Sequence, residues 1–169
     1  MLAPDQHLVL VGMMAVGKTT VARKVAERVG RVLFDTDAMI EQRSGRSVRD
    51  IFADDGEGVF RALEADMLSI ALASDTPAVI AAAGGVVLSR ENRQALKRSN
   101  ARVVWLCADR DTLLHRIGGE AHRPLLDDDP AGTLQRMFRE REALYREVAD
   151  AVVDVDQRSV DEVVEAVLA

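Results

Sequence analysis

Short apolar runs alternate with helical patterns along all 169 residues of this chain. Five runs are typical of β-strands: residues 8–11, 32–34, 78–82, 103–107 and 151–153. Helical periodicity is found in residues 19–29, 38–43, 48–52, 58–73, 90–97, 110–117, 134–149 and 160–168. Strands that are apolar at nearly every position, with helices between them, indicate a parallel sheet covered on both faces. We therefore predict one α/β domain over residues 1–169, with three layers (α/β/α) around a five-stranded parallel sheet.

The first strand-to-helix junction has the spacing G-x-x-x-x-G-K-[ST] over residues 12–19. A loop of this kind binds nucleotide phosphates, because its backbone N–H groups and the N-terminus of the next helix point at phosphate oxygens. Lys18 would place its charge near the β- and γ-phosphates, and the Thr19 hydroxyl could hold Mg²⁺. The predicted ATP contacts in this loop are Gly12, Ala15, Val16, Gly17, Lys18, Thr19 and Thr20.

The charge and hydropathy of the sequence limit the kinds of molecule that this protein could bind. The chain has 22 basic and 28 acidic residues, for a formal net charge of -6. This balance argues against a broad nucleic-acid surface, although one pocket can still concentrate arginines. No apolar run approaches the length of a membrane span, and residues 1–7 do not resemble a secretory signal. We expect a cytoplasmic protein without a membrane or nucleic-acid partner.

Polar residues and glycines follow two further strands, at the edge of the sheet where ligands of α/β proteins gather. Asp35 and Asp37 lie two residues apart and share a face if the backbone is extended. One could hold Mg²⁺ through water while the other positions or deprotonates a hydroxyl group. Capping of the next helix by Asp37 is an equally good interpretation. Gly84 and Gly85 could let backbone N–H groups approach a ligand, but a tight turn explains them more simply.

Three arginines are candidates for binding an anion. Arg61 and Arg141 each have acidic neighbours at helical spacing, which favours solvated ion pairs on exposed helix faces. Arg123 lies in the segment 117–131, where paired glycines, prolines and acidic residues have the composition of a mobile lid. An arginine in a lid can neutralise charge at a phosphoryl-transfer transition state.

Taken together, these residues resemble the shikimate kinases, small P-loop kinases related in fold to the nucleoside monophosphate kinases. The similarity runs through nearly the whole chain. It rests on residues 12–20, Asp35-Thr36-Asp37, residues 40–52, Phe60-Arg61-Ala62-Leu63-Glu64, Ala83-Gly84-Gly85, Arg123-Pro124-Leu125-Leu126 and Arg141-Glu142-Ala143-Leu144-Tyr145.

The resemblance implies an ATP- and Mg²⁺-dependent enzyme, acting as a monomer, that phosphorylates the 3-hydroxyl group of shikimate. It places the shikimate carboxylate against Arg61 and Arg141, because arginine suits bidentate binding of carboxylates. It places Asp37 on the ring hydroxyls, where this residue could act as base, beside the backbone of Gly84 and Gly85. Helices at about residues 38–66 would then bind the acceptor, and residues 117–131 would form the lid.

The same resemblance assigns residues on the nucleotide side. Thr19, and Asp35 through water, would hold Mg²⁺, while Lys18 and Arg123 would contact the transferred phosphoryl group. Arg116 would lie against adenine, and Arg158 would line the same pocket.

Two alternatives stay open. A kinase of the same fold could act on gluconate, a cyclitol or a nucleoside monophosphate, or the chain could be a catalytically silent nucleotide-binding module. The presence of Lys18, Asp37 and the acceptor arginines argues against the silent module. Ala15 and Ala83 stand where the family usually has glycine. If either residue requires positive φ, the strain would be about 1–2 kcal/mol.

Overall fold

A five-stranded sheet forms the centre of the computed structural model, which describes residues 2–118 and 129–169. The strand order is β2-β3-β1-β4-β5, and every neighbouring pair is parallel. The strands are β1 (His7–Val11), β2 (Val32–Asp35), β3 (Ala78–Ala81), β4 (Ala101–Cys107) and β5 (Ala151–Asp154). The predicted five-stranded parallel sheet is therefore confirmed.

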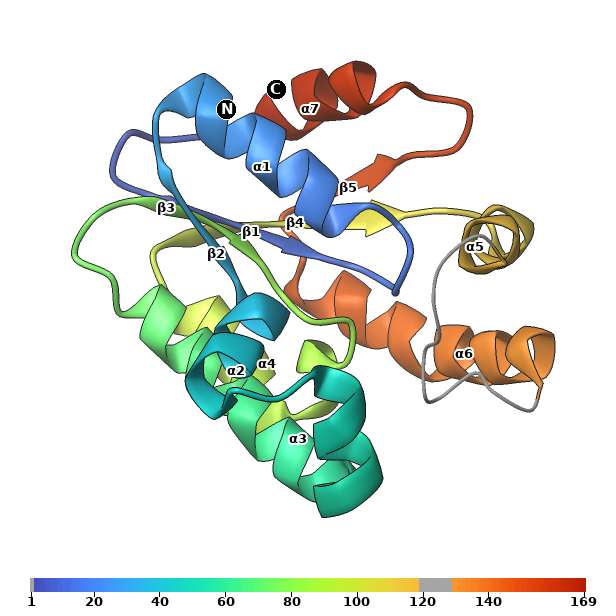
Figure 1. The fold of residues 1–169 in the computed structure, drawn as a ribbon. Coiled ribbons are helices and arrows are strands. Elements are labelled where there is room, and N and C mark those ends of the chain that lie inside the picture. Colours follow the sequence, from blue (N-terminus) through green and yellow to red (C-terminus); the bar gives the residue numbers. More distant parts are fainter. Residues whose placement is uncertain (1, 119–128) are drawn as a thin grey trace.

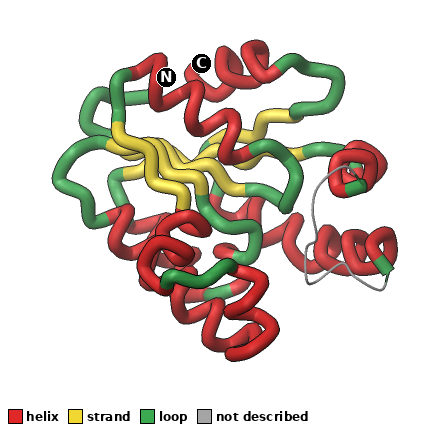
Figure 2. The backbone as a smooth tube through the Cα atoms, in the orientation of Figure 1, coloured by secondary structure: helices red, strands yellow, loops and turns green. Residues whose placement is uncertain are grey.

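Helices cover both faces of this sheet, which confirms the three layers (Figures 1 and 2). On one face lie α1 (Lys18–Val29) and α7 (Val160–Leu168). On the other lie α4 (Arg90–Arg98) and α6 (Pro130–Val148), with α3 (Val48–Leu72) beside α4. The remaining helices are α2 (Thr36–Ser44), which pairs with α3, α5 (Arg110–Ile117), which packs on α6, and the short 3₁₀ helix η1 (Val86–Leu88).

The largest hydrophobic cluster surrounds β1, whose five residues are all buried. The uninterrupted apolar run Leu8–Val11 follows from this central position, because helices cover the strand on both faces. A second, smaller cluster joins α2 to α3 and consists of Ile40, Ile51, Phe60 and Met67. This separate cluster gives the α2–α3 pair its own packing beside the main core.

Strand register brings three loops to one edge of the sheet. Leu10 of β1 and Asp35 of β2 both pair with Ala81 of β3. Because all three strands are parallel, their carboxyl ends meet there. The phosphate loop, the start of α2 and the segment after β3 are neighbours for this reason.

The predicted break between helices 48–52 and 58–73 is confirmed, because α3 is interrupted at Gly56, whose φ of 84° and ψ of 172° are not helical. The start of α6 differs from the prediction by several residues. α6 begins at Pro130 rather than at residue 134, because proline is tolerated in the first helical turn and Asp129 accepts a hydrogen bond from the Gly132 N–H at 3.1 Å. Residues 130 and 131, predicted to be in the lid, are thus helical, and residue 117 ends α5. Residues 119–128 of that segment lie outside the described part.

Candidate active site

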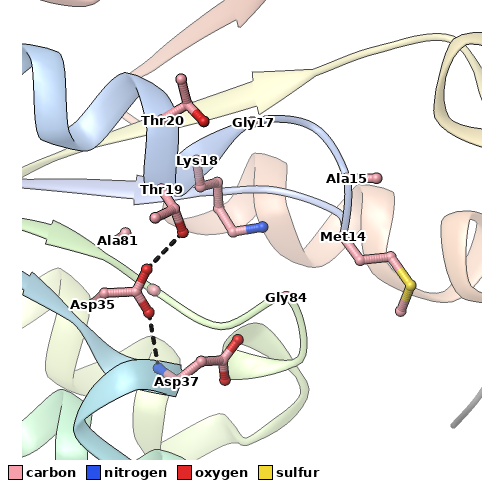
Figure 3. A pocket seen from close by; sticks show the side chains of 11 residues that line it. Met14, Ala15, Gly17, Lys18, Thr19, Thr20, Asp35, Asp37, Ala81 and Gly84 are labelled. Atoms are coloured by element: carbon pink, nitrogen blue, oxygen red, sulfur yellow. Dashed lines mark hydrogen bonds between the residues drawn. The ribbon is translucent and has the colours of Figure 1, made fainter. Parts of the chain in front are cut away.

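The phosphate loop runs from β1 to the N-terminus of α1. Lys18 folds back across this loop, and its Nζ donates hydrogen bonds to the carbonyl oxygens of Gly12 at 2.7 Å and Met13 at 2.8 Å. Its ammonium group is thereby held over the loop (Figure 3). The positive end of α1 and this ammonium face the same space, as binding of a polyphosphate requires.

Backbone strain is present at one of the two alanines that replace glycine. Ala15 has a φ of 62°, in the left-handed region that disfavours a side chain. Ala83 is not among the described non-glycine residues with positive φ. Left-handed backbone strain at an alanine is therefore present in the phosphate loop and not after β3.

Asp35, not Asp37, caps α2. Its Oδ1 accepts hydrogen bonds from the N–H groups of Asp37 at 3.1 Å and Ala38 at 3.2 Å. Its Oδ2 accepts from the Thr19 hydroxyl at 2.6 Å. The interpretation of Asp37 as the cap is wrong, because β2 extends to residue 35 and the helix starts directly after it. Asp37 lies in the first turn of α2, and its carboxylate points toward Gly84 (Figure 3).

One cavity lies between these elements. It is lined by Met14, Ala15, Gly17, Lys18, Thr19, Thr20, Asp35, Asp37, Ala81, Ala82 and Gly84. The lining combines the phosphate loop with the Asp35 and Asp37 carboxylates and a glycine backbone (Figure 3). The phosphate loop and two carboxylates therefore face a single space.

Arg61 forms a partly buried ion-pair cluster on α3. Its Nη1 lies 3.0 Å from Oε2 of Glu64, and its Nη2 lies 3.2 Å from Oε1 of Glu57. Glu64 is only 1% exposed, and this burial raises its pKa to about 7. The positive charge of Arg61 opposes the rise, and the nearby negative charge of Asp37 adds to it. The predicted ion pairs of Arg61 are present, but the pair with Glu64 is shielded from solvent.

The guanidinium group of Arg61 is packed as well as paired. Its Cζ lies 5.3 Å from the ring centroid of Phe60 and 6.0 Å from that of Phe52. A Cβ atom placed on Gly85 would lie 1.9 Å from Nη1 of Arg61. A side chain at position 85 would therefore displace this guanidinium from its present position.

Arg141 is buried, with 4% of its surface exposed, so the prediction of an exposed helix face is wrong for this residue. A Cβ atom on Gly84 would lie 3.7 Å from its Nη1, which places the Arg141 guanidinium beside the glycine backbone. Its Nε has no hydrogen-bond partner among the described residues. Burying a cation costs free energy unless anions compensate it, and both the nearby Glu64 carboxylate and an anionic ligand are suited to do so.

The other predicted nucleotide contacts lie around the phosphate loop. Arg116 of α5 donates from Nη1 to the carbonyl oxygens of Ala15 at 3.3 Å and Val16 at 3.0 Å. It lines a second cavity with Arg158 and His115, which opens beside the loop. Arg123 lies outside the described residues.

The structure places three further residues at the site to which the sequence alone assigned no role. Glu64 is the buried partner of Arg61, and Thr36 and Tyr145 are buried hydroxyl residues that contact the segment after β3. The position of Thr36 between two aspartates was the only local signal for it. For Tyr145, its place four residues after Arg141 gave a weaker signal.

The fold and this site define a P-loop kinase for a small molecule. The family model for shikimate kinase matches residues 14–169. The chain belongs to the shikimate kinase family. ATP is the co-substrate that this family implies.

Individual relatives agree with that assignment. A shikimate kinase from Symbiobacterium thermophilum is 44% identical over 165 residues, which cover 96% of this chain and 94% of the relative. The structure of a shikimate kinase from Acinetobacter baumannii in complex with shikimate has a TM-score of 0.92 and 34% identity, covering 96% of this chain and 90% of that one. A gluconokinase from Sinorhizobium meliloti, with a TM-score of 0.66, 22% identity and coverage of 99% and 91%, shares the fold.

Within the described residues, no helix combines the length and the apolar character that crossing a membrane requires.

Proposed function

We propose that this protein transfers the γ-phosphoryl group of ATP to the 3-hydroxyl group of shikimate. The observation that carries the proposal is that Lys18 and Asp37 line one cavity, beside the buried Arg141. Membership of the shikimate kinase family supports the same reaction.

In this reaction the acceptor oxygen attacks the γ-phosphorus, and the bond to the β–γ bridging oxygen breaks to release ADP. Asp37 orients the hydroxyl group and accepts its proton, and Lys18 neutralises charge on the phosphates. Phosphoryl transfer passes through a loose transition state, so positioning and charge neutralisation contribute more than a strong base. Arg123 would add positive charge from the lid segment 117–131.

The residues present are suited to Mg²⁺. The Thr19 hydroxyl oxygen and Oδ2 of Asp35 lie 2.6 Å apart beside the loop, and hard oxygen ligands are those that Mg²⁺ prefers. No cluster of three or more His, Cys, Asp or Glu side chains suited to a metal occurs among the described residues. The ion would therefore take its other ligands from water and phosphate. When bound, Mg²⁺ neutralises charge on the β- and γ-phosphates.

The acceptor carboxylate would bind between Arg61 and Arg141, and the backbone of Gly84 and Gly85 would contact the ring hydroxyls. Arg116 and Arg158 would contact adenine in the second cavity. We expect a monomeric, cytoplasmic enzyme without membrane partners, and the net charge of -6 argues against a broad nucleic-acid surface.

A panel of acceptors tests the proposal. ADP release is measured with ATP and Mg²⁺ in the presence of shikimate, gluconate, a cyclitol or a nucleoside monophosphate. We expect turnover with shikimate, and the product should carry phosphate on the 3-oxygen. Turnover only with another acceptor would overturn the proposal, and no turnover with any acceptor would favour the silent nucleotide-binding module.

A further inference from the structure

Two buried hydroxyl groups hold the segment Ala83–Gly85 from opposite elements. Thr36, the first residue of α2, is fully buried, and its Oγ1 accepts a hydrogen bond from the Ala83 N–H at 3.0 Å. Tyr145 of α6 is 1% exposed, and its O–H donates to the carbonyl oxygen of Gly84. The two bonds therefore fix the N–H of one residue and the carbonyl of the next.

These two hydrogen bonds determine where the neighbouring N–H groups point. In a planar trans peptide the C=O and N–H groups point in opposite directions. Since the Gly84 carbonyl is directed at Tyr145, the Gly85 N–H is directed away from it. The Ala83 carbonyl accepts from the Val86 N–H at 3.1 Å, which orients the Gly84 N–H in the same way. The glycine N–H groups are thus aimed by hydrogen bonds to atoms outside the substrate cavity.

Tyr145 is itself held rigidly. Its ring stacks on Trp105, with centroids 5.7 Å apart and an interplanar angle of 22°. Its hydroxyl lies close enough to Arg141, one helical turn earlier on α6, for the guanidinium charge to act on it. Burial raises the pKa of Tyr145 to about 12, so the phenol remains a donor throughout the neutral range. A single phenol therefore connects an acceptor arginine with the glycine backbone.

We propose that Thr36 and Tyr145 are positioning residues for the acceptor. Neither lines the substrate cavity, and each acts through the backbone of Ala83–Gly85. Thr36 connects this backbone to the turn that carries Asp35 and Asp37, and Tyr145 connects it to Arg141. The inference rests on the proposed function, because it assigns the glycine N–H groups to the acceptor.

The alternative is that both bonds only stabilise the fold. His7 supplies a matched control, since its Nδ1 accepts a hydrogen bond from the Ala78 N–H at 3.1 Å. Ala78 begins β3, and Ala83 follows the end of the same strand. His7→Phe thus removes a buried side-chain acceptor for a backbone N–H far from the cavity.

The test compares Thr36→Val and Tyr145→Phe, which keep side-chain shape and remove a hydroxyl, with Thr36→Ser and His7→Phe. We expect each hydroxyl deletion to raise the KM for shikimate about tenfold, the effect of losing one buried hydrogen bond, and to leave the KM for ATP within about twofold. Thr36→Ser should retain the wild-type KM. His7→Phe should lower Tm without changing the KM for shikimate.

Lower Tm with an unchanged KM for shikimate in both hydroxyl deletions would overturn the proposal, as would equal increases in KM for both substrates. Failure of the proposed function is recognised separately, because the wild-type protein would then not turn over shikimate. In that event the amide NMR signals of Gly84 and Gly85 provide the readout. They should shift in Thr36→Val and Tyr145→Phe but not in His7→Phe, and unchanged signals would refute the positioning role.

Discussion

Ala15 and Ala83 both stand where the family usually has glycine, but their backbone conformations differ. Ala15 adopts a φ of 62°, whereas Ala83 is not among the described residues with positive φ. Ala15→Gly should therefore stabilise the protein by up to about 1 kcal/mol, because relief of left-handed strain exceeds the added entropy of the unfolded chain. Ala83→Gly should destabilise it by about 1–2 kcal/mol, since the unfolded chain gains entropy and a buried methyl group is lost. Denaturant unfolding measures both, and equal effects would contradict this reading of the loop.

Arg141 is the arginine whose role depends most on burial. Arg141→Ala should raise the KM for shikimate roughly 100-fold, through loss of a charge-assisted bidentate contact, while the KM for ATP stays nearly constant. Arg136→Ala is the matched control, because Arg136 is exposed on the same helix and bonds only to Thr133 in the described contacts. A larger effect on ATP than on shikimate would refute the assignment.

At the scale of elements, the shape of α3 depends on one glycine. Gly56 bends the helix with a φ of 84° and a ψ of 172°, a conformation that is essentially restricted to glycine. Arg46 bonds to Asp54 at 2.8 Å and Asp55 at 2.5 Å, just before the bend. The bend therefore lies between this exposed ion-pair cluster and Arg61, which follows on the second half of the helix.

Gly56→Ala should destabilise the protein by about 1–3 kcal/mol, the cost of a side chain in that backbone region. A Cβ built at Gly56 or at Gly58 would meet no neighbouring segment within 4 Å, so only the local backbone conformation distinguishes the two positions. Gly58→Ala, in the helical part of α3, should instead stabilise by up to about 1 kcal/mol. Thermal unfolding of the two variants measures these changes in stability. Stabilisation by both substitutions would show that the bend in α3 does not require glycine at position 56.

At the scale of the whole molecule, global stability should depend on pH through Glu64. Burial raises its pKa from 4.5 to about 7, so the folded state binds this proton more tightly than the unfolded chain does. The contribution of Glu64 to the free energy of unfolding is fully present below about pH 4.5 and is lost as pH rises through about 7. Relative to Glu64→Gln, the wild-type protein should lose of the order of 2 kcal/mol between pH 5 and 8. Denaturant unfolding at both pH values measures this, and parallel profiles would contradict it.

Much of the architecture was predictable because its signals are local. Apolar runs and helical periodicity predicted the five strands and nearly all helices. The spacing of residues 12–19 predicted the phosphate loop. Helix ends were less predictable. The start of α6 at Pro130 was missed because proline and the acidic residues before it are typical of loops as well as of first turns.

The acceptor side was decided by contacts between segments far apart in the sequence. Periodicity shows which positions share a helix face, but not which neighbour covers that face. It therefore could not distinguish the buried Arg141 from an exposed ion pair, nor Asp35 from Asp37 as the cap of α2. Only the parallel register of β1, β2 and β3 brings Thr36, the glycines and the phosphate loop to one edge, where α6 adds Arg141 and Tyr145. The local sequence was sufficient to predict a phosphate loop because one continuous segment forms it, whereas the proposed acceptor site requires four segments to pack together.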